Sequence, residues 1–169
     1  MNRVRIIRQL IVLLVVTGAA VFASTAAGAP PTKIEGSFSV PPHTLSLCGF
    51  DVVSSATVTF TELDLVDQSG APTRSFFHIV EQDTFAANGK SLTSEPLTFN
   101  FDVLFDSSGN VEQIYISGIV EKVRLPDGSL FITSGRIDFT ARGNPEFVLT
   151  PDHGATVNLA GFCAALSPS

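Results

Sequence analysis

Residues 97–105 read LTFNFDVLF and contain the clearest structural signal in this chain. Apolar side chains occupy every second position, which is the spacing of a β-strand with one buried face. The stretch therefore predicts a strand that turns its apolar face toward a core. The side chains on that face are Leu97, Phe99, Phe101, Val103 and Phe105.

Similar period-two segments lie on both sides of this strand and are joined by short turn sequences. They span residues 33–40, 50–66, 73–87, 111–125, 129–140 and 146–150. One of the turns is Asn88-Gly89, the dipeptide favoured in two-residue hairpins. Short connections between long strands predict an all-β, antiparallel up-and-down meander of about seven or eight strands that closes into a small barrel. A two-sheet β-sandwich is the alternative.

Two local features of the first segments lead to further predictions. Pro41-Pro42 follows the first segment and is expected to end that strand, because proline cannot donate a ladder hydrogen bond. In the second segment the apolar positions run through Phe60 and then change phase at Leu63. We interpret this change as a β-bulge near Thr61–Glu62.

The last segment has a different period. In ATVNLAGFCAAL, residues 155–166, apolar side chains recur at three- and four-residue spacing, which is typical of a helix. Asn158 precedes the periodic residues and is a suitable N-cap. We therefore predict a short C-terminal helix that carries Cys163.

The N-terminal residues are typical of a secretory signal peptide. Arg3, Arg5 and Arg8 precede an apolar run over residues 10–23, and small residues follow. We interpret residues 1–29 as the signal peptide and residues 30–169 as a single secreted β domain. The apolar run has fewer than the roughly 20 residues that span a bilayer, so no stable membrane insertion is expected after cleavage.

The chain has two cysteines, Cys48 and Cys163, one near each end of the predicted domain. Export places them in an oxidising compartment, where two thiols of a small domain usually pair. We predict a disulfide between them and an extracellular location for the protein.

The charge of the predicted domain excludes some partners. The whole chain has 10 Lys and Arg against 16 Asp and Glu. The only charged residues of the leader are three arginines, so the mature domain keeps 7 basic residues against 16 acids, a net charge of −9. Nucleic acids and anionic lipid surfaces both require basic side chains, and neither is an expected partner. Charge repulsion at this level favours a monomer.

The chain has fourteen phenylalanines, one tyrosine and no tryptophan. Phenylalanine has no hydrogen-bonding group, so this composition indicates an interior lined by purely apolar rings. Either the interior is fully packed or it holds an apolar cavity. For the cavity, the predicted ligand-lining residues are Phe99, Phe101, Phe131 and Phe139.

The sequence contains no motif with the spacing of a metal, phosphate, dinucleotide or nucleophile site. No cofactor, metal or catalytic residue is therefore predicted. Glu121, Arg136 and Asp138 are expected on the outer face, because Ile137 and Phe139 occupy the alternate positions of the same segment.

Three functions follow from these patterns, in order of preference. The first is a non-catalytic secreted module that binds an apolar small molecule or a cell-envelope component. The second is a cofactor-free isomerase or cyclase, which requires a buried ionisable group such as Glu62, Glu81 or Asp102. The third is a structural or interaction protein of the cell surface.

Short motifs also give the chain a resemblance to known proteins. Cys48-Gly49-Phe50, Asn88-Gly89-Lys90 and the Cys-Ala-Ala-Leu of residues 163–166 resemble a group of small exported proteins from high-GC Gram-positive bacteria. That resemblance implies secretion and the disulfide, without an assigned activity. The layout is also similar to lipocalin-like and allene-oxide-cyclase-like barrels, which implies an architecture only.

Overall fold

The computed structural model of the protein describes residues 30–142 and 153–168. The predicted signal peptide, residues 1–29, and the predicted strand at 146–150 lie outside the described residues. No helix among the described residues is long and apolar enough to cross a membrane.

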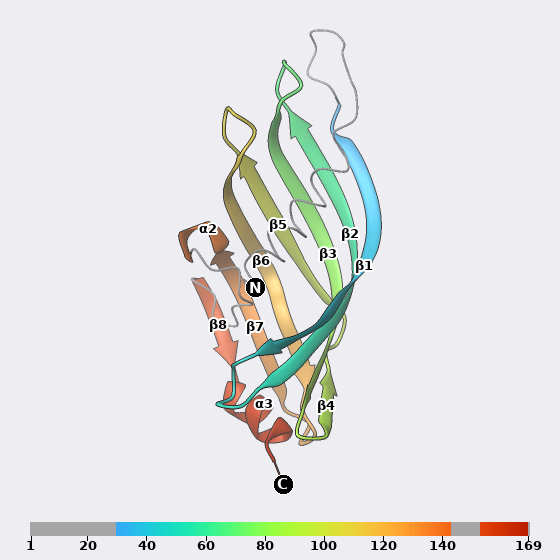
Figure 1. Cartoon of the computed structure of the whole chain (residues 1–169), viewed down its shortest axis with the longest axis vertical. Coiled ribbons are helices and arrows are strands. Elements are labelled where there is room, and N and C mark those ends of the chain that lie inside the picture. The colour runs from blue at the N-terminus through green and yellow to red at the C-terminus, as the bar shows by residue number, and fades with distance from the viewer. Residues whose placement is uncertain (1–29, 143–152, 169) are drawn as a thin grey trace.

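The described chain is mostly antiparallel β-sheet, as predicted (Figure 1). Its pairing order is β1-β2-β3-β5-β6-β7-β8, and the short strand β4 pairs with β3 off this path. The described residues also form two helices, α2 (Phe139–Arg142) and α3 (Leu159–Leu166). The strands are β1 (Thr32–Leu45), β2 (Val52–Val66), β3 (Pro72–Ala87), β4 (Lys90–Thr93), β5 (Leu97–Phe105), β6 (Val111–Arg124), β7 (Leu130–Asp138) and β8 (His153–Val157).

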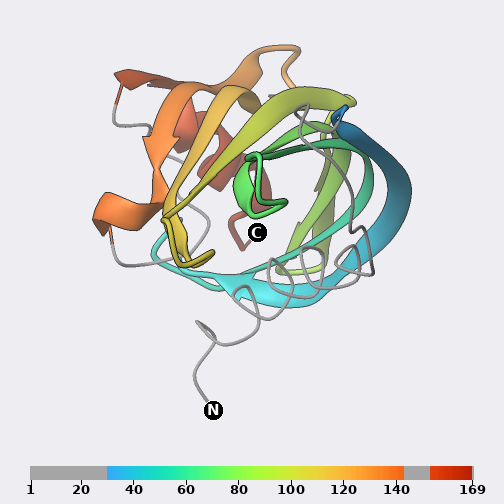
Figure 2. The same ribbon diagram turned by 90° about the horizontal axis from the view of Figure 1, so that it is seen from above.

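The sheet curls around an interior, and α3 lies at one end of that interior (Figure 2). β1 and β8 are the two edges of the sheet, and no described residues pair them with each other. The all-β meander is therefore confirmed, whereas closure into a barrel stays a prediction.

The prediction that Pro41-Pro42 ends the first strand was wrong. β1 continues to Leu45, and its register with β2 shifts between Val40 and His43. The two prolines lie in that irregularity. β1 is an edge strand, so the missing proline N–H groups remove no ladder bond on its open side.

The predicted bulge near Thr61–Glu62 was also wrong. β2 pairs with β3 without interruption from Val53 to Leu65, and the irregularity comes only after Leu65. The inward phase of the strand therefore continues through Glu62, which is 2% exposed. The apolar pattern changes here because an acid occupies an inward position, and β2 has no extra residue at this point.

The inward side chains form two hydrophobic clusters, one at each end of the interior. We call the first the helix end, because Phe162 and Leu166 of α3 fill it. We call the second the turn end, because its strands lead to the β2–β3 and β5–β6 turns. The buried helix-end residues are Leu45, Val52, Phe85, Leu92, Val123, Leu125, Phe131, Phe162 and Leu166. The buried turn-end residues are Ala56, Val58, Phe77, Ile79, Leu97, Phe99, Val103, Ile116, Val120 and Ile137.

The helix end is held by a disulfide and by polar anchors. Cys48 and Cys163 are bonded with a Cα–Cα distance of 5.2 Å, which confirms the predicted pair. Asn158 is the N-cap of α3, as predicted, and accepts a hydrogen bond from the backbone N–H of Gly161. At the other end of the helix, Lys90 Nζ donates to the carbonyl of Ser167 over 2.7 Å. The disulfide is consistent with an extracellular protein.

Candidate functional site

A layer of buried polar side chains separates the two hydrophobic clusters. On β2 it lies between Val52 and Ala56, and on β3 it lies between Ile79 and Phe85. On β6 it falls between Val120 and Val123. We call it the carboxyl layer. Its buried members are Ser54, Asp83, Ser94, Glu121 and Thr133, and the half-buried Glu81 completes it.

The alternation of β3 places two acids in this layer. Ile79, Glu81, Asp83 and Phe85 share the inward face, because they lie two residues apart on one strand. Asp83 is 3% exposed, and its backbone N–H donates to Ser94 Oγ over 2.8 Å. β3 thus turns two carboxyl groups toward the interior between two apolar residues.

A β-bulge brings the third acid inward from β6. The register of β6 with β7 shifts between Ile119 and Glu121, so Val120 is an additional residue and both Val120 and Glu121 are buried. Glu121 is completely buried, at 0% exposure. The prediction that Glu121 lies on the outer face was therefore wrong.

The other charged residues of that prediction occupy different surroundings. Arg136 is exposed, as predicted, and its guanidinium lies 3.8 Å from the centre of the Tyr115 ring. Asp138 is half-buried and accepts hydrogen bonds from Gln113 and from the backbone N–H of Thr140. Neither of them belongs to the carboxyl layer.

The three carboxyl groups lie close enough to influence one another's titration. Burial raises the pKa of Glu81 to about 9, and the neighbouring charge of Asp83 adds to the rise. Burial raises the pKa of Glu121 as well, and the charges of Asp83 and Glu81 act in the same direction. The pKa of Asp83 is raised by burial, although its hydrogen bonds with Glu121 and Glu81 oppose this.

Ionised carboxylates cannot satisfy each other in this arrangement. Both oxygens of Glu121 and Oδ2 of Asp83 are buried without a hydrogen-bond donor. Asp83 nevertheless lies within hydrogen-bonding reach of Glu81 and Glu121. A carboxylate only accepts hydrogen bonds, whereas a protonated carboxyl group also donates one. A proton on one of these groups would supply the missing donor.

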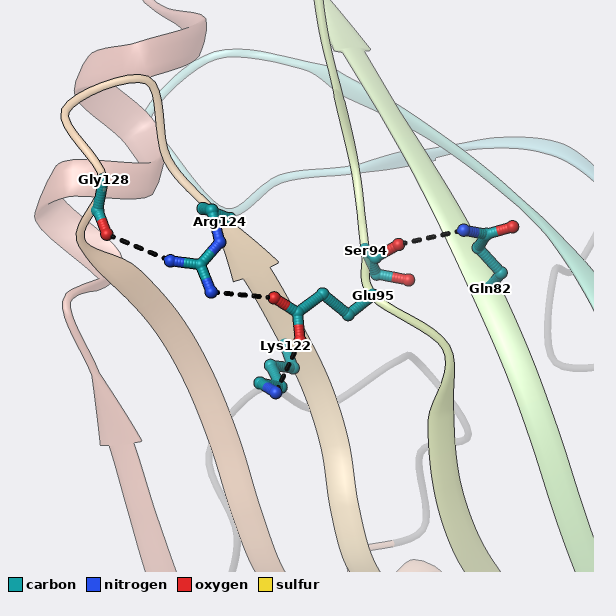
Figure 3. A network of polar contacts seen from close by, with 6 residues as sticks. All are labelled: Gln82, Ser94, Glu95, Lys122, Arg124 and Gly128. Atoms are coloured by element: carbon teal, nitrogen blue, oxygen red, sulfur yellow. Dashed lines mark hydrogen bonds and ion pairs between the residues drawn. The ribbon is translucent and has the colours of Figure 1, made fainter.

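The carboxyl layer adjoins a junction in the sheet, because Ser94 belongs to both. Figure 3 shows this junction with Gln82, Ser94, Glu95, Lys122 and Arg124. Here β4 ends and β5 begins, and Ser94 forms a bridge to Val123 of β6. On the other side of the junction, Glu95 forms ion pairs with Lys122 at 2.5 Å and with Arg124 at 3.1 Å. The basic side chains nearest to the junction are thus paired with an exposed acid and leave the buried acids uncompensated.

The turn end of the interior has phenylalanine side chains that are only partly buried. Phe38 and Phe60 lie 6.1 Å apart between ring centres, and Phe60 and Phe77 lie 6.3 Å apart. On the neighbouring strand β5, Phe101 lies opposite Phe77 and contacts both Phe99 and Phe139. We call this surface the phenylalanine face. Its partly buried members are Phe38, Val40, Phe60, Phe101, Phe105, Ile114 and Phe139.

Glu62 adds an acid to the phenylalanine face. It lies two residues from Phe60 and directly opposite Phe77 in the register of β2 and β3. Burial raises its pKa to about 8, and the nearby charge of Asp64 contributes to the rise. Asp64 itself accepts a hydrogen bond from Ser75. Glu62 is therefore largely protonated at neutral pH.

The predicted ligand-lining residues do not all come together. At the turn end, Phe101 contacts both Phe99 and Phe139. Phe131 belongs to the helix end, where its ring centre lies 4.7 Å from that of Phe162. Binding at any of these residues stays a prediction.

Two depressions lie along β1, β2 and β3 in the described part of the chain. The larger has a volume of about 550 Å³ and the smaller about 250 Å³. Phe38 and Glu81 are among the residues that line the larger, Phe60 lines the smaller, and none of the four predicted phenylalanines lines either. In the described part of the chain, no three His, Cys, Asp or Glu side chains are arranged to hold a metal ion.

Sequence reasoning identified some of these acids and missed others. Glu62, Glu81 and Asp102 were considered as buried groups: Glu62 is buried, Glu81 is half-buried, and Asp102 forms a salt bridge with Arg74. Asp83 was missed, although its position four residues after Ile79 and two before Phe85 gives the inward phase. Glu121 was missed because the phase of β6 changes at a bulge that carries no glycine or proline.

The comparisons with known proteins give no assignment. The chain matches no protein-family model, and neither curated proteins nor solved structures yield a match. The proposals below therefore depend on the residues and their geometry alone.

Proposed function

We propose that the protein is a non-catalytic secreted module that binds an apolar small molecule against the phenylalanine face. The observation that supports this most is the contrast in burial among inward aromatic rings. Phe85, Phe131 and Phe162 are fully buried at the helix end, whereas Phe101 and Phe139 remain partly exposed. Inward apolar rings that keep contact with water gain free energy when a ligand covers them.

The chemistry of the face indicates the kind of ligand. The rings belong to phenylalanines, which offer area and aromatic contacts but no hydrogen bond. Glu62 is a buried acid opposite Phe77, and its raised pKa makes it a neutral hydrogen-bond donor near pH 7. A mainly apolar ligand with one carbonyl, ether or hydroxyl oxygen fits both features.

Binding of a neutral apolar fluorophore such as N-phenyl-1-naphthylamine tests the proposal. Truncation of a fully covered ring removes about 1.5–3 kcal/mol of apolar contact, so Phe101→Ala is expected to raise the Kd about tenfold or more. Ile119→Ala is the matched control, because Ile119 is a large apolar residue that is 43% exposed. Its Kd is expected to stay within about twofold of wild type. Equal effects of the two substitutions, or no saturable binding by the wild type, would contradict the proposal.

A second candidate function is a cofactor-free isomerase or cyclase, and Glu62 is the observation that favours it. A carboxyl group with a pKa of about 8 beside apolar rings is suited to donate a proton at neutral pH. To test this, a ligand that the protein binds is incubated with wild type and with Glu62→Gln and then recovered for chromatography. An isomer formed by the wild type alone supports catalysis, whereas an unchanged ligand in both samples excludes it for that ligand.

A further inference from the structure

We propose that Glu81, Asp83 and Glu121 form a proton-binding site that ties β3 to β6 while the carboxyl groups share protons and loosens that connection when they ionise. This site is separate from the phenylalanine face and does not require the proposed ligand. Its ligand is the proton itself, held between like acids of two strands that do not pair with each other.

One completely buried acid of this site has no hydrogen-bond donor around it. Glu121 is 0% exposed, and neither of its oxygens has a donor. An ionised carboxylate in such a position would carry the full cost of desolvation. Asp83 Oδ2 lies within reach and lacks a donor too. One proton between Asp83 and Glu121 turns two unsatisfied acceptors into a hydrogen-bonded pair.

Few charged groups of the described chain surround the site. From β1 the nearest is His43, which is exposed and hydrogen-bonded to the carbonyl of Pro41. From β6, Lys122 is paired with Glu95. The layer residues of β2 and β7 are Ser54 and Thr133, which carry no charge, and the buried α3 residues are apolar. Among the described residues, His43 is the one basic side chain with an electrostatic effect on the site, and it acts on Asp83.

The three acids lie where β3 and β6 approach each other. At this level the main chains of β3 and β6 are linked through the segment between β4 and β5. Ser94 N–H donates to the Asp83 carbonyl, and Glu95 N–H donates to the Lys122 carbonyl, over 2.9 and 2.8 Å. Like charges on Asp83 and Glu121 would repel across this short link. Ionisation therefore strains the junction that holds the two clusters together.

The sign of the pH effect follows from linkage. The folded-state pKa of these acids is raised, so the folded protein keeps protons that the unfolded chain loses above about pH 4.5. Stability is therefore greatest in acid and decreases as the pH rises toward the folded values, which reach about 9 at Glu81. Each retained proton lowers the folding equilibrium constant about tenfold per pH unit in that window.

Chemical denaturation of the purified protein between about pH 5 and pH 9 tests the site. The Glu62→Gln background removes the other acid with a raised pKa. In that background the folding constant is expected to fall about tenfold or more per pH unit. Adding Glu121→Gln keeps the shape of the side chain and removes one titrating group. The fall of the folding constant per pH unit should then become about tenfold smaller. Adding Glu112→Gln, an exposed residue of the same strand, should leave it unchanged.

Infrared spectroscopy gives a second readout that does not depend on the Glu121 variant. At pH 7 the Glu62→Gln protein is expected to show the carbonyl stretching band of protonated carboxyl groups, and the band should disappear as the pH approaches 10. Absence of the band at pH 7 would overturn the proposal. A folding constant that is flat or rises from pH 5 to pH 9 would overturn it equally.

Discussion

The two ends of the interior are made of the same residue type but differ in how completely it is covered. At the helix end, Phe85 and Phe131 pack on Phe162 and all three are fully buried. At the turn end, Phe101 and Phe139 pack on the core and remain partly exposed. The helix end is covered by α3, which lies near the C-terminus of the chain and is joined to Cys48 by the disulfide. The comparison separates phenylalanines that stabilise the fold from phenylalanines that are available to a ligand.

The disulfide is expected to have the largest effect on this contrast. Cys48 and Cys163 are 115 residues apart, and the chain-entropy model assigns nearly 5 kcal/mol to a bridge of that loop length. Replacing both by alanine is therefore expected to lower the free energy of unfolding by roughly that amount and to expose the helix end. Urea denaturation measures it. A loss below about 1 kcal/mol would show that α3 packs without its covalent link.

Truncation of one ring at each end compares the two clusters directly. Phe162→Ala removes a fully buried ring and should cost about 3–5 kcal/mol in the free energy of unfolding. Phe101→Ala removes a partly exposed ring, and less than about half of that cost is expected. The two values come from the same denaturation experiment. Equal losses would mean that the turn end is packed as densely as the helix end.

The N-cap of α3 is expected to contribute less to the free energy of unfolding than the disulfide or Phe162. Asn158 has a left-handed backbone, with φ at 62°, and its side chain caps Gly161. Asn158→Ala removes the cap and adds backbone strain, for about 1–2 kcal/mol, whereas Asn158→Gly relieves the strain and should cost only a few tenths. If glycine costs as much as alanine, the left-handed conformation does not contribute to the docking of α3.

The smallest effect is expected on the solvent side of the junction. Glu95 pairs with Lys122 and Arg124, and all three side chains are substantially exposed. Exposed ion pairs contribute about 0–1 kcal/mol, so Glu95→Gln should change the free energy of unfolding by less than 1 kcal/mol. The difference should shrink further in high salt. A loss above about 2 kcal/mol would indicate that the ion pairs hold β6 against the segment between β4 and β5.

The period of the sequence predicted the strands well because most inward positions are apolar. LTFNFDVLF forms β5, the Asn88-Gly89 turn joins β3 to β4, and the cysteines pair as their context implied. The strand and the turn depend on neighbouring residues, and the cysteine pairing was inferred from the predicted oxidising compartment. Local rules are sufficient for them.

The carboxyl layer was harder to predict because its residues violate the rule used to find the inward face. Glu62 was interpreted as a change of strand phase, although the register of β2 with β3 continues past it. Glu121 was placed outside because the bulge at Val120 changes the phase of β6. Only the pairing of distant strands distinguishes an inward acid from a shifted strand. That information is absent from a single segment.

Fluorescence quenching tests the contrast between the two ends most directly, because the protein has no tryptophan of its own. Phe101→Trp and Phe131→Trp each place one reporter at one end of the interior. Acrylamide is predicted to quench the reporter at position 101 several times more strongly than the reporter at position 131, and an apolar ligand should protect only the former. Equal protection at both positions without ligand would contradict an exposed phenylalanine face.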